Sequence, residues 1–404
     1  MVGGASGSGR VAMVTVRRAT DDDATAIVEL NRVYNGDNAA VEINSTFRAG
    51  HITPGDFAIA VAGDRVVSAV GLLPMELRVG DVVTPAGQPE FIATDPDFRG
   101  QGLVRRLLDL VHRWSADRGD LVQVIAGIPF FYRQFGYSYG LRRPVEWLVP
   151  AETEVEAGRE WEVRAAAPSD IDEICALEEA AQSGATIRLP FLPALWPVLL
   201  ALPHAPVLVA MAGGRVEAVT RVRTAPGGPL HLQGIAATSP LAAKAVIAAA
   251  RADYPGRTLV VGERAGLPLR GILGAAAPVA RRKWLYVRIA NPAGLLRHLR
   301  PVLDDRVASS PFASADGRIE ISFYRSGAAI GYRGGRVTEV TATGRDESGG
   351  SPPDVHLPPD LLARLLFGPG NVLDWENDPD VDLGPHRDLM AVLLPPLRAD
   401  VLIW

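Results

Sequence analysis

Residues 90–108 read EFIATDPDFRGQGLVRRLL, and this is the most informative segment of the sequence. It predicts a strand, an Asp-Pro turn, a loop with two glycines, and an amphipathic helix over about residues 102–116. A helix start leaves backbone N–H groups unpaired, and the helix dipole adds partial positive charge there. The stretch therefore predicts an anion site suited to a pyrophosphate. Gly100 and Gly102 let phosphates approach the backbone, and Arg99 and Arg105 can add charge-assisted hydrogen bonds.

The composition is that of an ordinary globular protein. The chain has 404 residues, of which 48% are hydrophobic and 22% charged, with a net charge of −5. This length predicts two to four domains at roughly 100–200 residues each. The negative charge argues against nucleic-acid binding, and no apolar run is long enough to cross a bilayer. One cysteine implies no internal disulfide, and the Gly/Ser-rich start lacks a signal-peptide core, so we expect a cytoplasmic protein without a membrane partner.

Two segments of the chain begin alike, at a constant offset of 147 positions. Both predict a short strand, a helix start at an aspartate, and apolar residues at helical spacing. The matching residues are Val16, Arg17, Ala19, Asp23, Ile27 and Leu30, which recur as Val163, Arg164, Ala166, Asp170, Ile174 and Leu177. The match predicts a duplicated domain start, with coincidence between two ordinary strand-to-helix openings as the alternative.

The remaining patterns divide the chain into three parts. The first continues with predicted strands at 57–61, 66–73 and 122–126 and a short helix from 130. The second has a hairpin at 207–211 and 216–222, a helix at 241–252 and a strand at 258–261, but it lacks the glycine-rich turn. The third changes to an α+β pattern, with strands at 285–289, 318–324, 328–332 and 337–342 and helices near 292–299 and 358–366.

About thirty residues after the glycine loop, residues 129–137 read PFFYRQFGY. The loop and this segment together resemble the GNAT superfamily of N-acyltransferases. In that family an Arg-x-x-Gly-x-Gly/Ala loop before a helix holds the CoA pyrophosphate, and a later segment supplies a tyrosine beside the thioester sulfur. Arg99-x-x-Gly102-x-Val104 follows the pattern, except that Val104 replaces the last small residue. That departure concerns packing, because the pyrophosphate contact uses backbone N–H groups.

The strings RGQGLVR and YRQFGY look like those of the Eis-type (enhanced intracellular survival) acetyltransferases. This resemblance implies a mixed α+β and α/β fold of tandem GNAT domains followed by a sterol-carrier-like α+β domain. The implied boundaries are a flexible tail at 1–11, a catalytic GNAT domain at 12–150, a degenerate GNAT domain at 151–284 and the sterol-carrier-like domain at 285–404.

The resemblance also implies roles for individual residues. The pantetheine arm of acetyl-CoA would contact the backbone of Ile92, Ala93 and Thr94. The remaining cofactor contacts would come from Arg99, Gly100, Gln101, Gly102, Leu103, Val104, Arg105 and Gly127. Tyr132 would protonate the leaving thiolate as general acid, and its alternative is a core tyrosine with a paired hydroxyl.

Two groups are candidates for the base that deprotonates the amine. One is the C-terminal carboxylate at Trp404, because in the Eis-type family this group reaches the active domain. The terminus here is apolar and aromatic, which is also what a simply packed last strand would show. The other candidate is Glu90, which shares a strand face with Ile92, or else is a solvated edge carboxylate.

The implied function is transfer of an acetyl group from acetyl-CoA to a primary amine of a small molecule, such as an aminoglycoside or another polyamine. Asp37 and Glu42 are candidates for binding a cationic amine, with a solvated polar loop as the alternative. Another acyl-CoA, a hydroxyl acceptor, or a non-catalytic lipid- or CoA-binding role stays open. The scattered histidines predict no metal site, and the resemblance implies a homo-oligomer, for which a hexamer is one candidate.

Overall fold

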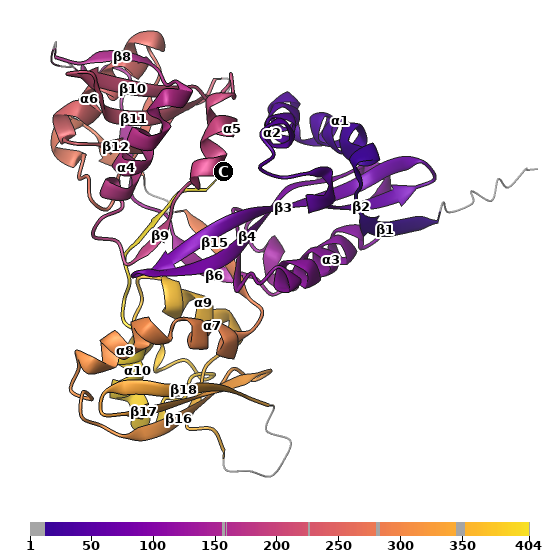
Figure 1. The fold of residues 1–404 in the computed structure, drawn as a ribbon, viewed down its shortest axis with the longest axis vertical. Coiled ribbons are helices and arrows are strands. Elements are labelled where there is room, and N and C mark those ends of the chain that lie inside the picture. Colours follow the sequence, from indigo (N-terminus) through magenta and orange to yellow (C-terminus); the bar gives the residue numbers. More distant parts are fainter. Residues whose placement is uncertain are drawn as a thin grey trace, which may run out of the picture. The chain divides into compact units, whose positions relative to one another are not determined.

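The computed structural model describes residues 13–155, 158, 160–224, 227–279, 283–344 and 352–403 (Figure 1). These residues fall into two compact units. The first holds the described residues up to Leu73 together with Pro89–Arg118, and the second holds Pro74–Gln88 and the described residues after Arg118. Strands β3 (Arg65–Val79) and β4 (Val82–Thr94) contribute to both units. Within the described residues, no helix is long and apolar enough to span a membrane.

The first unit is an antiparallel arrangement of strands with helices around it. Strand β2 pairs with β1 on one side and with β3 on the other. Helix α3 packs on β1 and β2, and α1 packs on α2. The bounds are β1 Val14–Arg18, α1 Ala24–Asn35, α2 Asp37–Arg48, β2 Phe57–Ala62 and α3 Leu103–Asp117. Helix α3 confirms the helix predicted from the glycine loop.

The second unit contains a sheet in the order β14-β7-β13-β12-β11-β10-β8. Helices α4 and α6 pack against its strands β11 and β12. The bounds are β7 Glu146–Val149, β8 Glu162–Ala165, α4 Ile171–Ala181, α5 Trp196–Leu200, β10 Val207–Ala212, β11 Arg215–Thr224, β12 Leu230–Ala237, α6 Pro240–Asp253, β13 Leu259–Gly262 and β14 Ala277–Pro278. The order β8-β10-β11-β12-β13 therefore repeats the order β1-β2-β3-β4-β5, where β5 is Val122–Ile125.

The two repeated segments also share an arginine–aspartate turn. Arg17 donates two hydrogen bonds to Asp23, at 2.7 and 2.8 Å, and Arg164 donates two to Asp170, at 2.6 and 2.9 Å. Each aspartate also accepts from the backbone N–H three residues earlier. The shared turn supports duplication over coincidence.

Two strands lie in a sheet other than the one their position in the chain suggests. Strand β15 (Trp284–Ile289), expected to open the third part, instead pairs antiparallel with β5 (Val122–Ile125) and β6 (Ser138–Arg142). Strand β7 follows β6 directly but pairs with β13. The expected boundaries at 150 and 284 thus do not separate the hydrogen-bonded sheets.

The rest of the second unit is an α+β region with a four-stranded sheet in the order β18-β17-β16-β19. Helices α7 and α8 pack on this sheet (Figure 1). The bounds are α7 Pro292–His298, α8 Arg300–Ala308, β16 Gly317–Ser322, β17 Gly327–Arg333, β18 Arg336–Thr343, β19 Val355–His356, α9 Pro359–Phe367 and α10 Arg387–Leu393. The chain then returns as β20 (Ala399–Val401), which pairs with β9 (Ile187–Leu189).

Replacing Asp23 by asparagine is expected to change how stability depends on pH. The hydrogen bonds from Arg17 lower the pKa of Asp23 to about 2 in the folded chain. A depressed folded pKa stabilises the fold above the unfolded pKa, and this contribution is lost as pH falls toward 2. The stability difference between wild type and Asp23→Asn, measured by urea unfolding, should shrink between pH 4 and pH 2. The exposed neighbour change Asp22→Asn is the control, and an equal pH response in both variants would contradict the assignment.

Candidate functional site

The loop before α3 has a backbone that only glycine adopts easily. Gly100 and Gly102 have φ values of +73° and +70°, and a Cβ atom at either position would meet nothing within 4 Å. Glycine is therefore required at these two positions by the backbone conformation and not by a lack of space for a side chain. Both glycines are exposed, as are Arg99 and Gln101 between and beside them, so the loop is open to a ligand.

In the described part of the chain, the start of α3 has no side-chain cap at its N-cap position. Its N-cap residue is Gly102, which has no side chain to offer, although α3 is 15 residues long. The equivalent helix of the second sheet, α6, starts differently: Ser239 Oγ accepts a hydrogen bond from Ala242 N at 3.1 Å, and Pro240 has no N–H to donate. The α3 start keeps its donors for a ligand, whereas the α6 start satisfies its own.

Asp95 stabilises the turn that precedes the glycine loop. It is buried, accepts a hydrogen bond from Asp97 N at 3.0 Å, and is paired with Arg65. The Arg65 guanidinium also lies 5.5 Å from the centre of the Phe98 ring. The sequence signal for this support was the Asp-Pro pair, because aspartate commonly accepts from the backbone two residues later in a turn.

The end of β4 carries a distortion and a set of side-chain hydrogen bonds. Phe91 has a φ of +54°, unusual for a residue other than glycine, and its ring stacks on Phe57 at 6.3 Å. The carbonyl of Ile92 accepts from Asn35 Nδ2 at 3.3 Å, and that of Ala93 accepts from Ser68 Oγ at 3.0 Å. Ser68 Oγ also lies 2.7 Å from Thr94 Oγ1, and Arg99 Nε donates to the Thr94 carbonyl at 3.4 Å. Asn35 and Ser68 were not predicted, since nothing local in the sequence links them to β4.

The acidic candidates have different surroundings. Glu90 is half-buried on β4. Asp37 is exposed at the first position of α2, whereas Glu42 is buried on the same helix. Five residues turn an α-helix by about 140°, so α2 presents these two carboxylates in different directions. The structure does not bring Asp37 and Glu42 together.

Tyr132 lies in a short helical turn, Phe131–Phe135, of the second unit. It is only 6% exposed, and its ring centre lies 5.1 Å from Phe131 and 5.9 Å from Tyr286 of β15. Gly127 makes room for this ring, because a Cβ at 127 would come within 2.1 Å of Tyr132 Cδ2. Gly127 therefore has a packing role that the sequence did not indicate.

The hydroxyl group of Tyr286 holds the backbone that leads into the Tyr132 turn. Its hydroxyl accepts from Phe130 N at 2.6 Å and donates to Tyr139 Oη at 2.9 Å. Burial, and then the bond with Tyr139, raise the pKa of Tyr286 to about 12, so this hydroxyl stays protonated at neutral pH. Phe130 has a φ of +69° and is exposed. The exchanged strand β15 thus fixes the backbone that enters the Tyr132 turn.

The last described residues of the chain are tightly held. Leu402 N donates to the Leu189 carbonyl at 2.9 Å, and Ile403 is 5% exposed. Trp404, the candidate C-terminal base, lies outside the described residues. Among the described residues, no group of three or more histidine, cysteine or acidic side chains is placed to hold a metal ion.

A family model described as an acetyltransferase (GNAT) domain matches residues 15–140. The match covers less than half of the chain, and this part of the chain is similar to a GNAT acetyltransferase domain. It contains the α3 start, the end of β4, Gly127 and Tyr132. A domain of this family implies an acyl-CoA co-substrate, and the glycine-bearing start of α3 fits its pyrophosphate.

Solved structures resemble the chain over nearly its whole length. A GCN5-related N-acetyltransferase from Kribbella flavida is 18% identical with a TM-score of 0.69, covering 97% of this chain and 100% of its own. A probable N-acyltransferase from Enterococcus faecalis is 13% identical with a TM-score of 0.70, covering 97% and 100%. Eis1 from Mycobacterium abscessus is 15% identical with a TM-score of 0.61, covering 96% and 99%. At these identities the likeness shows the fold alone, and no curated protein matches the sequence.

Alanine at position 127 is expected to disturb Tyr132. The added Cβ would overlap the tyrosine ring, so Gly127→Ala should lower the free energy of unfolding by about 1–3 kcal/mol through overpacking. In a Tyr132→Ala background the same change should cost much less, which a double-mutant cycle by urea unfolding measures. Gly271→Ala, at a site where a Cβ meets nothing within 4 Å, is the control. Equal losses with and without the tyrosine ring would refute the packing role.

Proposed function

We propose that the protein is an acetyl-CoA-dependent N-acetyltransferase acting on a primary amine of a small molecule. The observation that carries this proposal is the start of α3, where two left-handed glycines leave an exposed helix end without a protein cap inside a GNAT domain. The second sheet has the same helix but caps it with Ser239. Of these two helix starts, the first therefore keeps donors for an anion.

Residues of the α3 loop would bind acetyl-CoA. The backbone N–H groups of Leu103, Val104 and Arg105 would donate to the pyrophosphate, supported by the helix dipole. Arg99 and Gln101, both exposed, would add side-chain donors. The backbone of Ile92, Ala93 and Thr94 would contact the pantetheine arm, within a β4 end that Asn35 and Ser68 already hold in place.

When bound, acetyl-CoA supplies a thioester whose carbonyl carbon the amine nitrogen attacks directly. Tyr132 would donate its hydroxyl proton to the departing thiolate sulfur, and the amine would lose a proton to a base. The aromatic cluster around Tyr132 would keep its hydroxyl in one position and exclude water. The base is either the Trp404 carboxylate or Glu90, and Asp37 or Glu42 would attract a cationic amine.

The wider organisation follows the same proposal. The 12–150 region would be catalytic, the 151–284 region a degenerate GNAT domain, and the 285–404 region a sterol-carrier-like domain built on the four-stranded sheet β16–β19. A homo-oligomer in the cytoplasm is the proposed working form.

Alanine at Gly102 is expected to weaken CoA binding at least tenfold, because it forces the helix start out of its left-handed conformation. Calorimetric titration of acetyl-CoA measures this. Gly119→Ala is the matched control: Gly119 also has a positive φ (+92°) and open space around it, but follows the other end of α3. The control should lose similar stability and keep its affinity. Equal affinity in both variants, or no CoA binding by wild type, would overturn the proposed site and favour the carrier alternative.

Phenylalanine at Tyr132 is expected to lower turnover by about 10²–10⁴-fold, the usual contribution of a general acid, with CoA affinity nearly unchanged. Free-thiol release over a panel of amines and alcohols measures turnover and identifies the acceptor class. Tyr137→Phe is the control, since Tyr137 is a neighbouring buried tyrosine whose hydroxyl donates to Gln123. That variant should lose stability but keep turnover within a few-fold. Full activity of Tyr132→Phe would remove Tyr132 from the mechanism.

A further inference from the structure

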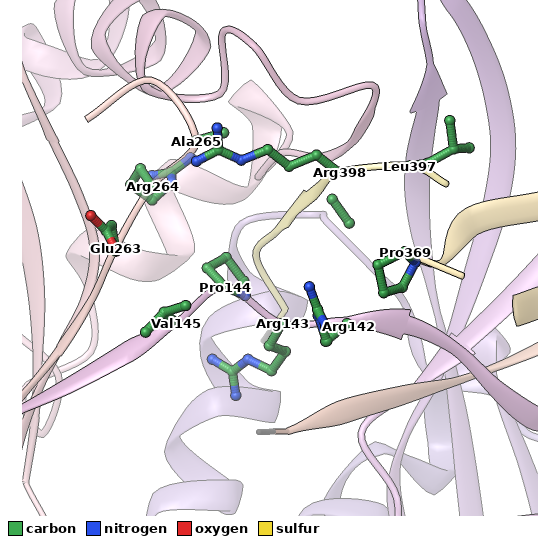
Figure 2. Close-up of a pocket in the computed structure, with 11 residues that line it drawn as sticks. Arg142, Arg143, Pro144, Val145, Glu263, Arg264, Ala265, Pro369, Leu397 and Arg398 are labelled. Atoms are coloured by element: carbon green, nitrogen blue, oxygen red, sulfur yellow. The ribbon is translucent and has the colours of Figure 1, made fainter. Parts of the chain in front are cut away.

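The described residues of the second unit enclose a cavity of about 100 Å³, and among them four arginines and one carboxylate residue line it. Its walls come from the end of β6 and the link after it, the segment after β13, Pro369, and the residues at the start of β20 and just before it (Figure 2). The charged lining residues are Arg142, Arg143, Arg264, Arg398 and Glu263. No lining residue belongs to the α3 loop, so the cavity is distinct from the proposed CoA site.

Arg264 is the buried centre of this cluster, with only 2% of its surface exposed. Its Nε donates to Asp400 at 2.9 Å and its Nη1 to Glu178 at 2.8 Å. Its Nη2 is buried without a hydrogen-bond partner among the described residues. An unsatisfied buried donor of a charged group is costly, so a ligand that accepts from it would be stabilised.

Glu263, the acidic residue among the described lining residues, already has partners. Glu263 accepts from Trp147 Nε1 at 3.1 Å and from Leu269 N at 3.2 Å, one on each carboxylate oxygen. Arg143 has a buried Nε without a partner among the described residues, and its nearest carboxylate, Glu146, is 4.0 Å away and pairs at 3.0 Å with Lys283. Burial lowers the pKa of Arg143, so the charged guanidinium is poorly compensated there.

Arg398 brings the C-terminal segment into the cluster. It precedes β20, and Figure 2 shows its side chain extending toward Arg264 and Ala265. Within the described residues, its exposed guanidinium has no hydrogen-bond or ion-pair partner. Guanidinium groups that line one cavity repel one another unless an anion lies between them, and their fork geometry matches an oxyanion.

We propose that this cavity binds a small tetrahedral oxyanion of the phosphate class and thereby fastens the C-terminal strand. The volume suits an ion of a few heavy atoms, since one water molecule takes up about 30 Å³ of liquid volume. The ion would bridge Arg398 to Arg264 and to the Arg142–Arg143 link. Binding would hold β20 against β9, and with it the last residues of the chain.

The test is hydrogen exchange of residues 399–403 in the full-length protein, with inorganic phosphate titrated against sodium chloride at constant ionic strength. At about ten times the dissociation constant, exchange in wild type should slow roughly tenfold, since binding stabilises by mass action. Arg398→Gln should abolish this protection. Arg398 is exposed and has no side-chain partner within the described part of the chain, so the variant is expected to fold normally.

Two further variants separate the possible sites. Arg333→Gln removes an exposed arginine of β17 and should respond to phosphate as wild type does. Arg99→Gln weakens the α3 loop and should also keep the protection. Loss of protection in Arg99→Gln with retention in Arg398→Gln would assign the phosphate effect to α3 and overturn the proposal. No saturable protection in wild type would overturn it as well.

Discussion

Strands β7 and β15 are exchanged between two sheets, and this exchange fixes which strands are neighbours in both of them. Strand β15 lies between β5 and β6, so both of its edges are hydrogen-bonded, and β7 lies between β13 and β14. The two crossing links are joined where Arg143 N donates to the Lys283 carbonyl at 3.0 Å. Tyr286 reaches the Tyr132 turn only because β15 is in this place, and the arginine cavity lies at the link after β6.

A second fixed point is the buried group formed by Arg264, Glu178 and Asp400. Arg264 donates hydrogen bonds to both carboxylates, and Asp400 also accepts one from Ala265 N at 2.7 Å. Burial raises the pKa of Glu178 in spite of the arginine, so desolvation is the larger effect on that carboxyl. Removing one partner of such a group would leave a buried charge uncompensated, which typically costs about 3–5 kcal/mol. The C-terminal strand is therefore held by charge as well as by backbone pairing.

The features that the sequence predicted are local ones. The α3 start was predictable because a strand, two glycines and an amphipathic helix follow one another within nineteen residues. The duplication was predictable because the Arg17–Asp23 and Arg164–Asp170 turns each form within seven residues. Domain boundaries and the C-terminal base stay predictions.

The unpredicted features join distant segments. Tyr286 and Phe130 are 156 positions apart, and Arg264 and Asp400 are 136 apart. The alternation of apolar and polar residues along a strand does not specify the strand with which it pairs. An exchange of strands between sheets changes the pairing partners and leaves this alternation unchanged. Asp37 and Glu42 show the converse: proximity in sequence suggested one site, and helical geometry placed them in different environments.

Because Ser239 caps α6, the stabilities of the two repeated domains depend differently on the concentration of ligand. A helix whose start binds a ligand is stabilised in proportion to the logarithm of that ligand's concentration, once the concentration exceeds the dissociation constant. A helix that is capped by its own side chain is not stabilised in this way. With CoA bound as proposed, the first domain would become more resistant to proteolysis when acyl-CoA is abundant. The second domain would keep the same resistance to proteolysis whatever the concentration of acyl-CoA.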